Sequence, residues 1–258
     1  MIQTLQGAAL EDRVAYLNEL IASAPPEMVE EFRTQFDMSW IYHDSGIEGV
    51  VYTQEELEAA FRGDVVNDST LMPIYDEIRN HQLAIEMIRD YAGRKRFQLT
   101  LDVVKKLYAQ LAPEELEGKA PPKYRKDMPT HRHYFHEIAP PDKISYRMRQ
   151  LIQWINDPET KRSVHPIRIA ARAHAQMLHI YPFPRHSGKV ARLVMNLILL
   201  RAGFPPAVIH AKLRQPYYEA LKNGDNAVST LIHEALVSSL ESMIRFYEEG
   251  LGKSQTPA

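Results

Sequence analysis

The chain has no cysteine among its 258 residues, and this absence removes several kinds of chemistry at once. Without thiols it cannot form a disulfide, use a cysteine nucleophile or bind a metal through sulfur. It also has no excess of charge, because 31 basic and 33 acidic residues give a formal net charge of −2. A broad electrostatic attraction to nucleic acid or to anionic membranes is therefore not expected.

Long apolar runs are missing as well. No run reaches the roughly 18 residues that a membrane-spanning helix needs, and the N-terminus lacks the basic start and apolar segment of a secretory signal. The remaining composition, 45% hydrophobic and 25% charged, is that of an ordinary globular protein. We therefore expect a cytoplasmic protein that binds neither nucleic acid nor membrane, with a homodimer as one candidate assembly.

Apolar residues recur at helical spacing through most of the chain, which predicts an all-α fold. The clearest helical patterns cover residues 29–42, 76–91, 144–156, 165–178 and 229–247, with others after Thr53, Thr100 and Gly188. The helix over residues 29–42 is expected to be followed by a break at Ser45, Gly46 and Gly49, and Thr53 with Glu56 has the spacing of a capping box. The helix after Gly188 is apolar nearly all round, so other helices should surround it.

The expected organisation has an N-terminal helical region over residues 1–112, a core over 113–250 and a flexible tail over 251–258. Residues 114–141 contain five prolines and no helical period, and HRHYFHEI within them reads as a short strand or hairpin. The histidines there, His131, His133 and His136, do not predict a metal site. On a strand the third faces away from the other two, and no fourth ligand is evident.

The most informative stretch runs from Tyr181 to Arg192, YPFPRHSGKVAR. Its turn-forming residues lead through Gly188 directly into the apolar helix. A helix N-terminus presents unpaired N–H groups that favour anions, and glycine lets the backbone approach a ligand closely. Lys189 and Arg192 share one stripe of this helix, and cations on a buried helix need partners. The sequence therefore predicts an anion or carboxylate at this site.

This stretch resembles the motif of the Fic (Fido) domain family, His-Pro-Phe-x-(Asp/Glu)-Gly-Asn-Gly-Arg-x-x-Arg. Most enzymes of that family move AMP from ATP onto a protein hydroxyl. The resemblance extends over roughly residues 40–245. It implies a helical Fic fold with N-terminal helices, a motif loop and helix at 181–201, and a β-hairpin flap at 121–141. In the family this flap holds a protein segment, which places an expected protein partner at residues 131–138.

The departures from the family motif fall on the chemistry. Tyr181 stands where the family has its general base, and a tyrosine titrates near ~10, against ~6.5 for histidine. Arg185 stands where an acidic residue holds Mg²⁺, and a guanidinium cannot ligate a cation. His186 is a candidate substitute base, and Arg185 could serve as counter-charge to a polyphosphate. The resemblance leaves an anion-binding set formed by Arg185, Ser187, Gly188, Lys189 and Arg192.

A second segment, DSGIEG within residues 42–53, resembles the inhibitory segment of the family, Ser-x-x-x-Glu-Gly. Glu48 matches the glutamate, and Asp44 takes the place of the serine. In relatives this glutamate approaches the second arginine of the motif and obstructs productive ATP binding, so Glu48 is expected to pair with Arg192. Some relatives use it to position water and remove AMP, and that role stays open for Glu48.

Three functions are consistent with these residues. The leading one is a degenerate Fic-fold protein that binds an anion, a nucleotide such as ATP or a protein segment, without Mg²⁺, as a regulatory module. The alternative is an enzyme of altered chemistry that transfers or removes AMP or another phosphate-containing group through Tyr181, His186 or Glu48. The third is a structural protein whose pocket is closed by Glu48.

Overall fold

The computed structural model describes residues 2–64, 68–116, 122–129 and 137–253 of the chain, with side chains from residue 10 onward. All regular elements among these described residues are helices, with no strand, which confirms the all-α prediction. The elements in chain order are α1 (Ile2–Ser23), α2 (Pro26–Ile47), α3 (Gln54–Arg62), α4 (Met72–Gly93), α5 (Leu101–Leu111), η1 (Pro113–Glu115), α6 (Pro141–Asn156), α7 (Pro158–Ser163), α8 (Pro166–Ile180), α9 (Ser187–Arg201), η2 (Ala211–Leu213), α10 (Arg214–Asn223) and α11 (Asp225–Gly250).

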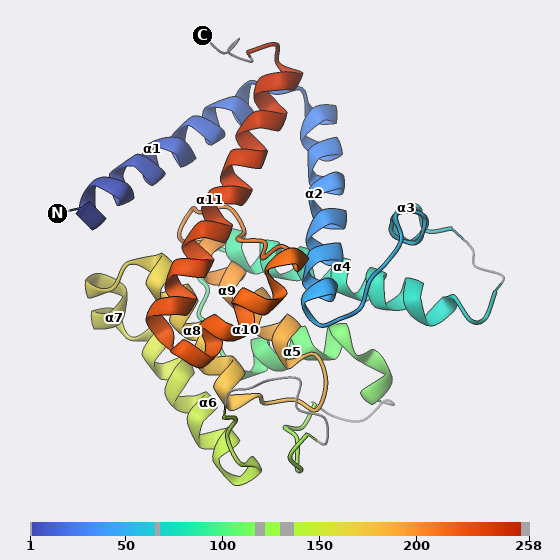
Figure 1. The fold of residues 1–258 in the computed structure, drawn as a ribbon, viewed down its shortest axis with the longest axis vertical. Coiled ribbons are helices and arrows are strands. Elements are labelled where there is room, and N and C mark those ends of the chain that lie inside the picture. The colour runs from blue at the N-terminus through green and yellow to red at the C-terminus, as the bar shows by residue number, and fades with distance from the viewer. Residues whose placement is uncertain (1, 65–67, 117–121, 130–136, 254–258) are drawn as a thin grey trace.

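Helices α8 and α9 form the centre of the fold. They pack on each other, α4 and α5 cover α9, and α6 and α11 cover α8. Figure 1 shows α1, α2 and α11 meeting at one end of the molecule and diverging from it, so that the lower end of α2 comes down beside α4. Twelve of the 15 residues of α9 are buried, as the apolar pattern predicted. Lys189 and Arg192, in the buried part of α9, therefore face other helices, whereas Arg201 at its end is exposed.

Helix α2 is longer than the sequence pattern predicted. The expected break is wrong at Ser45 and Gly46, because the helix continues to Ile47, but the break expected at Gly49 is present, with φ of 90°. Glycine at position 46 is explained by close packing instead. A Cβ on Gly46 would lie 2.7 Å from the Cβ of Ala211 in η2. The glycine thus lets α2 press against η2, which brings the last turn of α2 into the core.

We expect Gly46→Ala to destabilise the protein by about 1–3 kcal/mol, because both contacting groups are too rigid to move aside. Gly93→Ala is the matched control, since a Cβ there meets nothing within 4 Å and Gly93 also lies in a helix. That change should be neutral or stabilise by up to about 1 kcal/mol. Chemical denaturation followed by circular dichroism measures both. Equal effects at the two glycines would contradict the packing explanation.

The predicted capping signals are present, whereas no separate helix was predicted before residue 29 within the N-terminal helical region. Thr53 and Glu56 form both hydrogen bonds of the capping box at the start of α3. Helix α1 was missed, although its buried residues Leu10, Leu17 and Leu20 follow a helical spacing. This stripe packs on α11, so the N-terminal segment belongs to the hydrophobic core.

The stretch between α5 and α6 is described only in part. Residues 122–129 and 137–140 have no regular structure, so the predicted β-hairpin is not seen in these portions. His131, His133 and His136 lie outside the described residues, as does most of the expected docking segment 131–138. Docking of a protein segment there stays a prediction. No helix within the described residues is both long and apolar enough to cross a membrane.

Candidate functional site

The loop between α8 and α9 is tightly held by its own residues. Tyr181, which follows the last residue of α8, and His186, which precedes α9, both have left-handed backbone conformations, with φ of 47° and 53°. Such conformations are uncommon outside glycine and persist where surrounding contacts impose them. The buried Ser187 hydroxyl supplies two such contacts, donating to the Phe183 carbonyl and accepting from the Phe183 N–H, both at 2.9 Å. The Ser187 hydroxyl is thus used within the loop.

Arg125, in the stretch between α5 and α6, binds the end of α8 and the start of this loop. Its side chain is buried and donates from Nε to the Tyr181 carbonyl at 2.7 Å and from a terminal nitrogen to the Ile180 carbonyl at 3.3 Å. The other donors reach the carbonyls of Asp127, at 3.0 Å, and Ala139. No ion pair to a carboxylate is found for Arg125 within the described ranges. Among the described residues its charge is compensated by backbone carbonyls and by Met128 Sδ at 3.5 Å, and these contacts join Asp127 and Ala139 to the end of α8.

Arg192 lies at the centre of the polar cluster under this loop, with a side chain only 3% exposed. Its Nε donates to Asp44 Oδ1, one terminal nitrogen donates to Glu48 Oε1 at 2.8 Å and the other to the Tyr217 hydroxyl at 3.3 Å. The predicted contact between Glu48 and Arg192 is present. A second carboxylate, Asp44, shares the same guanidinium.

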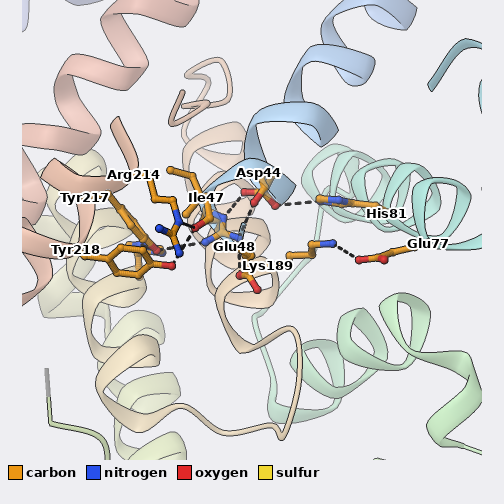
Figure 2. A network of polar contacts seen from close by, with 11 residues as sticks. Asp44, Ile47, Glu48, Glu77, His81, Lys189, Arg214, Tyr217 and Tyr218 are labelled. Atoms are coloured by element: carbon orange, nitrogen blue, oxygen red, sulfur yellow. Dashed lines mark hydrogen bonds and ion pairs between the residues drawn. The ribbon is translucent and has the colours of Figure 1, made fainter. Parts of the chain in front are cut away.

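Helix α4 supplies partners that the sequence reading did not include (Figure 2). Glu77 Oε1 accepts from Lys189 Nζ at 2.6 Å, and Lys189 is 1% exposed. One turn further on, His81 Nε2 lies 3.2 Å from Asp44 Oδ2, close but without normal hydrogen-bond geometry. The expectation that the cations of α9 need carboxylate partners is thus met by two helices, α2 and α4.

The titration of these groups follows from their burial and neighbours. Burial by itself would raise the pKa of Asp44, but the Arg192 guanidinium and His81 outweigh it and hold the pKa at about 2. Burial lowers the pKa of His81, so the imidazole is neutral near pH 7. Burial and then the Lys189 ammonium lower the pKa of His186 to about 4. Asp44 is therefore a full anion at neutral pH, while both histidines are uncharged.

Glu48 covers the start of α9. A Cβ on Gly188 would lie 2.1 Å from Glu48 Oε1, so the carboxylate rests directly on the bare Cα of this glycine. A helix N-terminus favours an anion at such a position. The space that the sequence assigned to a ligand anion is therefore taken by a carboxylate of the chain itself.

Arg185, by contrast, is exposed and pairs with Glu114 at 3.2 Å, so it does not enter the buried network. His186 is half-buried and close enough to Lys189, Glu48 and Glu77 for their charges to act on its pKa. Tyr181 is buried, 8% exposed. The described residues hold no group of three candidate metal ligands. An exposed guanidinium at the position of the family's acidic ligand does not fit Mg²⁺.

The sequence contained a signal for two of the partners in this cluster, Glu77 and His81. Glu77 and His81 are one turn apart, and His81 lies on the apolar stripe of α4 with Ile78 and Ile85, where a polar residue needs a partner. For Asp44 the sequence indicated only that it stands at the position of the serine in the family's inhibitory segment. Arg125 had no signal, because a basic residue in a proline-rich stretch is most often solvated.

Comparison with known proteins agrees with this geometry. Residues 98–199 match the model of the Fic/DOC family. The protein adenylyltransferase Fic of Drosophila grimshawi is 30% identical over 185 residues, which cover 70% of this chain and 37% of that protein. The chain thus spans little more than a third of the curated relatives it matches.

Two solved structures share the fold. A Fic domain containing signaling protein from Bacteroides thetaiotaomicron has a TM-score of 0.74 at 22% identity, with 96% of this chain and 99% of that chain covered. Fic-1 from C. elegans has a TM-score of 0.73 at 18% identity, with 95% and 73% covered. At these identities the likeness establishes the fold alone. Together with the family model that matches residues 98–199, it shows that this chain carries a Fic domain.

Proposed function

We propose that this chain is a Fic-fold regulatory module that binds an anionic ligand, with a nucleotide such as ATP as first candidate, and does not transfer AMP by the family's usual chemistry. One observation carries the proposal. The Glu48 carboxylate lies on Gly188 and accepts from Arg192 at 2.8 Å, in the place that the motif reserves for a phosphate. A carboxylate and a phosphate oxygen make the same charge-assisted hydrogen bonds to a guanidinium. A ligand phosphate and the Glu48 carboxylate therefore compete for the same position.

The absence of AMP transfer is supported by the groups around the loop. Tyr181 replaces the histidine base, and the neutral His186, with its pKa of about 4, has a low affinity for a proton near pH 7. Arg185 faces Glu114 at the surface instead of holding a cation. The proton acceptor and the metal ligand of the family are both replaced, whereas the positively charged side chains of α9 are kept.

Thermal unfolding with ATP, with and without Mg²⁺, tests the proposal. The Glu48→Ala variant has the space above Gly188 open, so we expect ATP to raise its melting temperature by about 2–4 °C, the shift that about 1 kcal/mol gives in a chain of this size. The unmodified chain should shift less, and Mg²⁺ should make no difference. Strict dependence on Mg²⁺ would contradict the role given to Arg185. No shift in either protein would favour a purely structural role with a closed pocket.

A second candidate function is an altered transfer or removal of AMP or another phosphate-containing group. The position of His186 favours it, because a half-buried neutral imidazole directly precedes α9 and lies near Lys189 and Glu48. Incubation with labelled ATP and a cell lysate tests this candidate, and we expect no label on any protein. Tyr181→His should behave in the same way, since the acidic metal ligand is still missing. Label transfer by the unmodified chain would establish the second function instead.

A further inference from the structure

Arg192 is held by two carboxylates that differ in how firmly they are placed. Glu48 contributes one contact, from a side chain that is 17% exposed and follows the last residue of α2. Asp44 contributes two, because its side chain accepts from Nε and its backbone carbonyl accepts from a terminal nitrogen at 3.3 Å. Its side chain is only 4% exposed. Removal of Glu48 therefore leaves the larger part of the Arg192 contacts in place.

We propose that Asp44 is a second and independent gate on Arg192, which keeps the Nε–H of this arginine from a ligand phosphate even when Glu48 has moved away. The inference rests on the proposed anion-binding function of the site. While Asp44 is paired, an anion that replaces Glu48 can use the start of α9 and the terminal nitrogen of Arg192 that Glu48 leaves, but not Nε.

The position of Asp44 is fixed from several sides, whereas Glu48 can leave by rotation of its side chain. The carbonyl of Ile47, one turn after Asp44, accepts from Arg214 Nε and from the Tyr218 hydroxyl, both at 3.0 Å, as Figure 2 shows. On the other side His81 of α4 lies against Asp44. Asp44 can release Arg192 only if the whole last turn of α2 moves out of these contacts.

The charge of the cluster leads to the same conclusion. With Glu48 in place, three carboxylates (Asp44, Glu48 and Glu77) face two cations (Lys189 and Arg192), which leaves one net negative charge. Without Glu48, two carboxylates balance two cations. The pocket then offers a phosphate no net positive charge, and a buried pair that is already satisfied does not exchange readily for a solvated ligand. Loss of the Asp44 charge as well makes the cluster cationic at Arg192.

Chemical labelling of Arg192 with phenylglyoxal, quantified by peptide mass spectrometry, tests the gate without any ligand. We expect Glu48→Ala to label Arg192 within about three-fold of the rate of the unmodified chain, and Asp44→Ser/Glu48→Ala to label it at least roughly ten-fold faster. Exposed Arg185 and buried Arg125 are internal standards for fast and slow labelling. If Glu48→Ala alone labels Arg192 as fast as the double variant, Asp44 is not a gate.

Folding of the variants is controlled by circular dichroism and by the unchanged slow labelling of Arg125. Should Asp44→Ser/Glu48→Ala fail to fold, Asp44→Asn/Glu48→Ala keeps the shape of the side chain and removes only its charge, with the same expected acceleration. ATP affinity separates the two proposals. Fast labelling of Arg192 in the double variant without ATP binding would reject the anion-binding function and leave the gate standing. Equal labelling in the single and double variants would reject the gate, whatever ATP does.

Discussion

Replacing Arg125 with methionine should lower the free energy of unfolding by about 3 kcal/mol or more, because each buried carbonyl left without a donor costs about 1–3 kcal/mol. Methionine fills much of the volume of the arginine stem but donates no hydrogen bond. The carbonyls of Tyr181, Ile180, Asp127 and Ala139 would all lose a donor. Chemical denaturation followed by circular dichroism measures the loss.

The matched control is Arg185→Met in the same loop region. Arg185 pairs with Glu114 at the surface, and both side chains are more than half exposed. Such a pair contributes at most about 1 kcal/mol, so this variant should unfold almost like the unmodified chain. Hydrogen exchange supplies a second measurement, since Arg125→Met should speed exchange of the Tyr181 N–H and its neighbours. Similar losses for the two arginines would show that Arg125 does not hold the loop.

Asp44→Ala is the second change with a large expected effect, a loss of about 3–5 kcal/mol, since it leaves the Arg192 guanidinium buried with most of its compensation gone. Glu48→Ala removes a carboxylate from the same arginine but should cost only about 1 kcal/mol, because Asp44 keeps Arg192 neutralised and Glu48 is partly solvated. The difference in unfolding free energy between the two variants is the measurement. Equal losses would mean that the two carboxylates are equivalent.

The pH dependence gives Asp44 a separate signature. Its pKa is about 2 in the folded protein against an ordinary value of 3.8. A lowered pKa stabilises the fold when the carboxyl is charged, so the contribution is complete above about pH 4 and is lost as the pH falls through 2. The shift corresponds to about 2 kcal/mol. The stability advantage of the unmodified chain over Asp44→Ala should therefore shrink by this amount between pH 5 and pH 2, measured by urea denaturation.

Short-range patterns explain which parts of the fold could be predicted. The capping box at Thr53 and Glu56 and the apolar helix after Gly188 depend on residues within a turn or two of each other, and both are present in the structure. The break expected at Ser45 and Gly46 was wrong because Gly46 serves a contact between distant parts of the chain. The sequence around Gly46 looks like a helix end, but contact with Ala211, far along the chain, is what the glycine serves.

The sequence by itself determined the all-α class and the Fic motif region, and its resemblance to the family motif led to the prediction that Tyr181 and Arg185 replace the family's base and metal ligand. It also indicated that the cations of α9 need anionic partners. Only the tertiary structure decided which anions these are. Asp44 and Arg192 are 148 residues apart, and Glu77 and Lys189 are 112 apart. Such pairs form where the packing of helices brings side chains together, because a buried charge without a partner costs too much free energy. Local sequence patterns do not indicate which side chains will meet in this way.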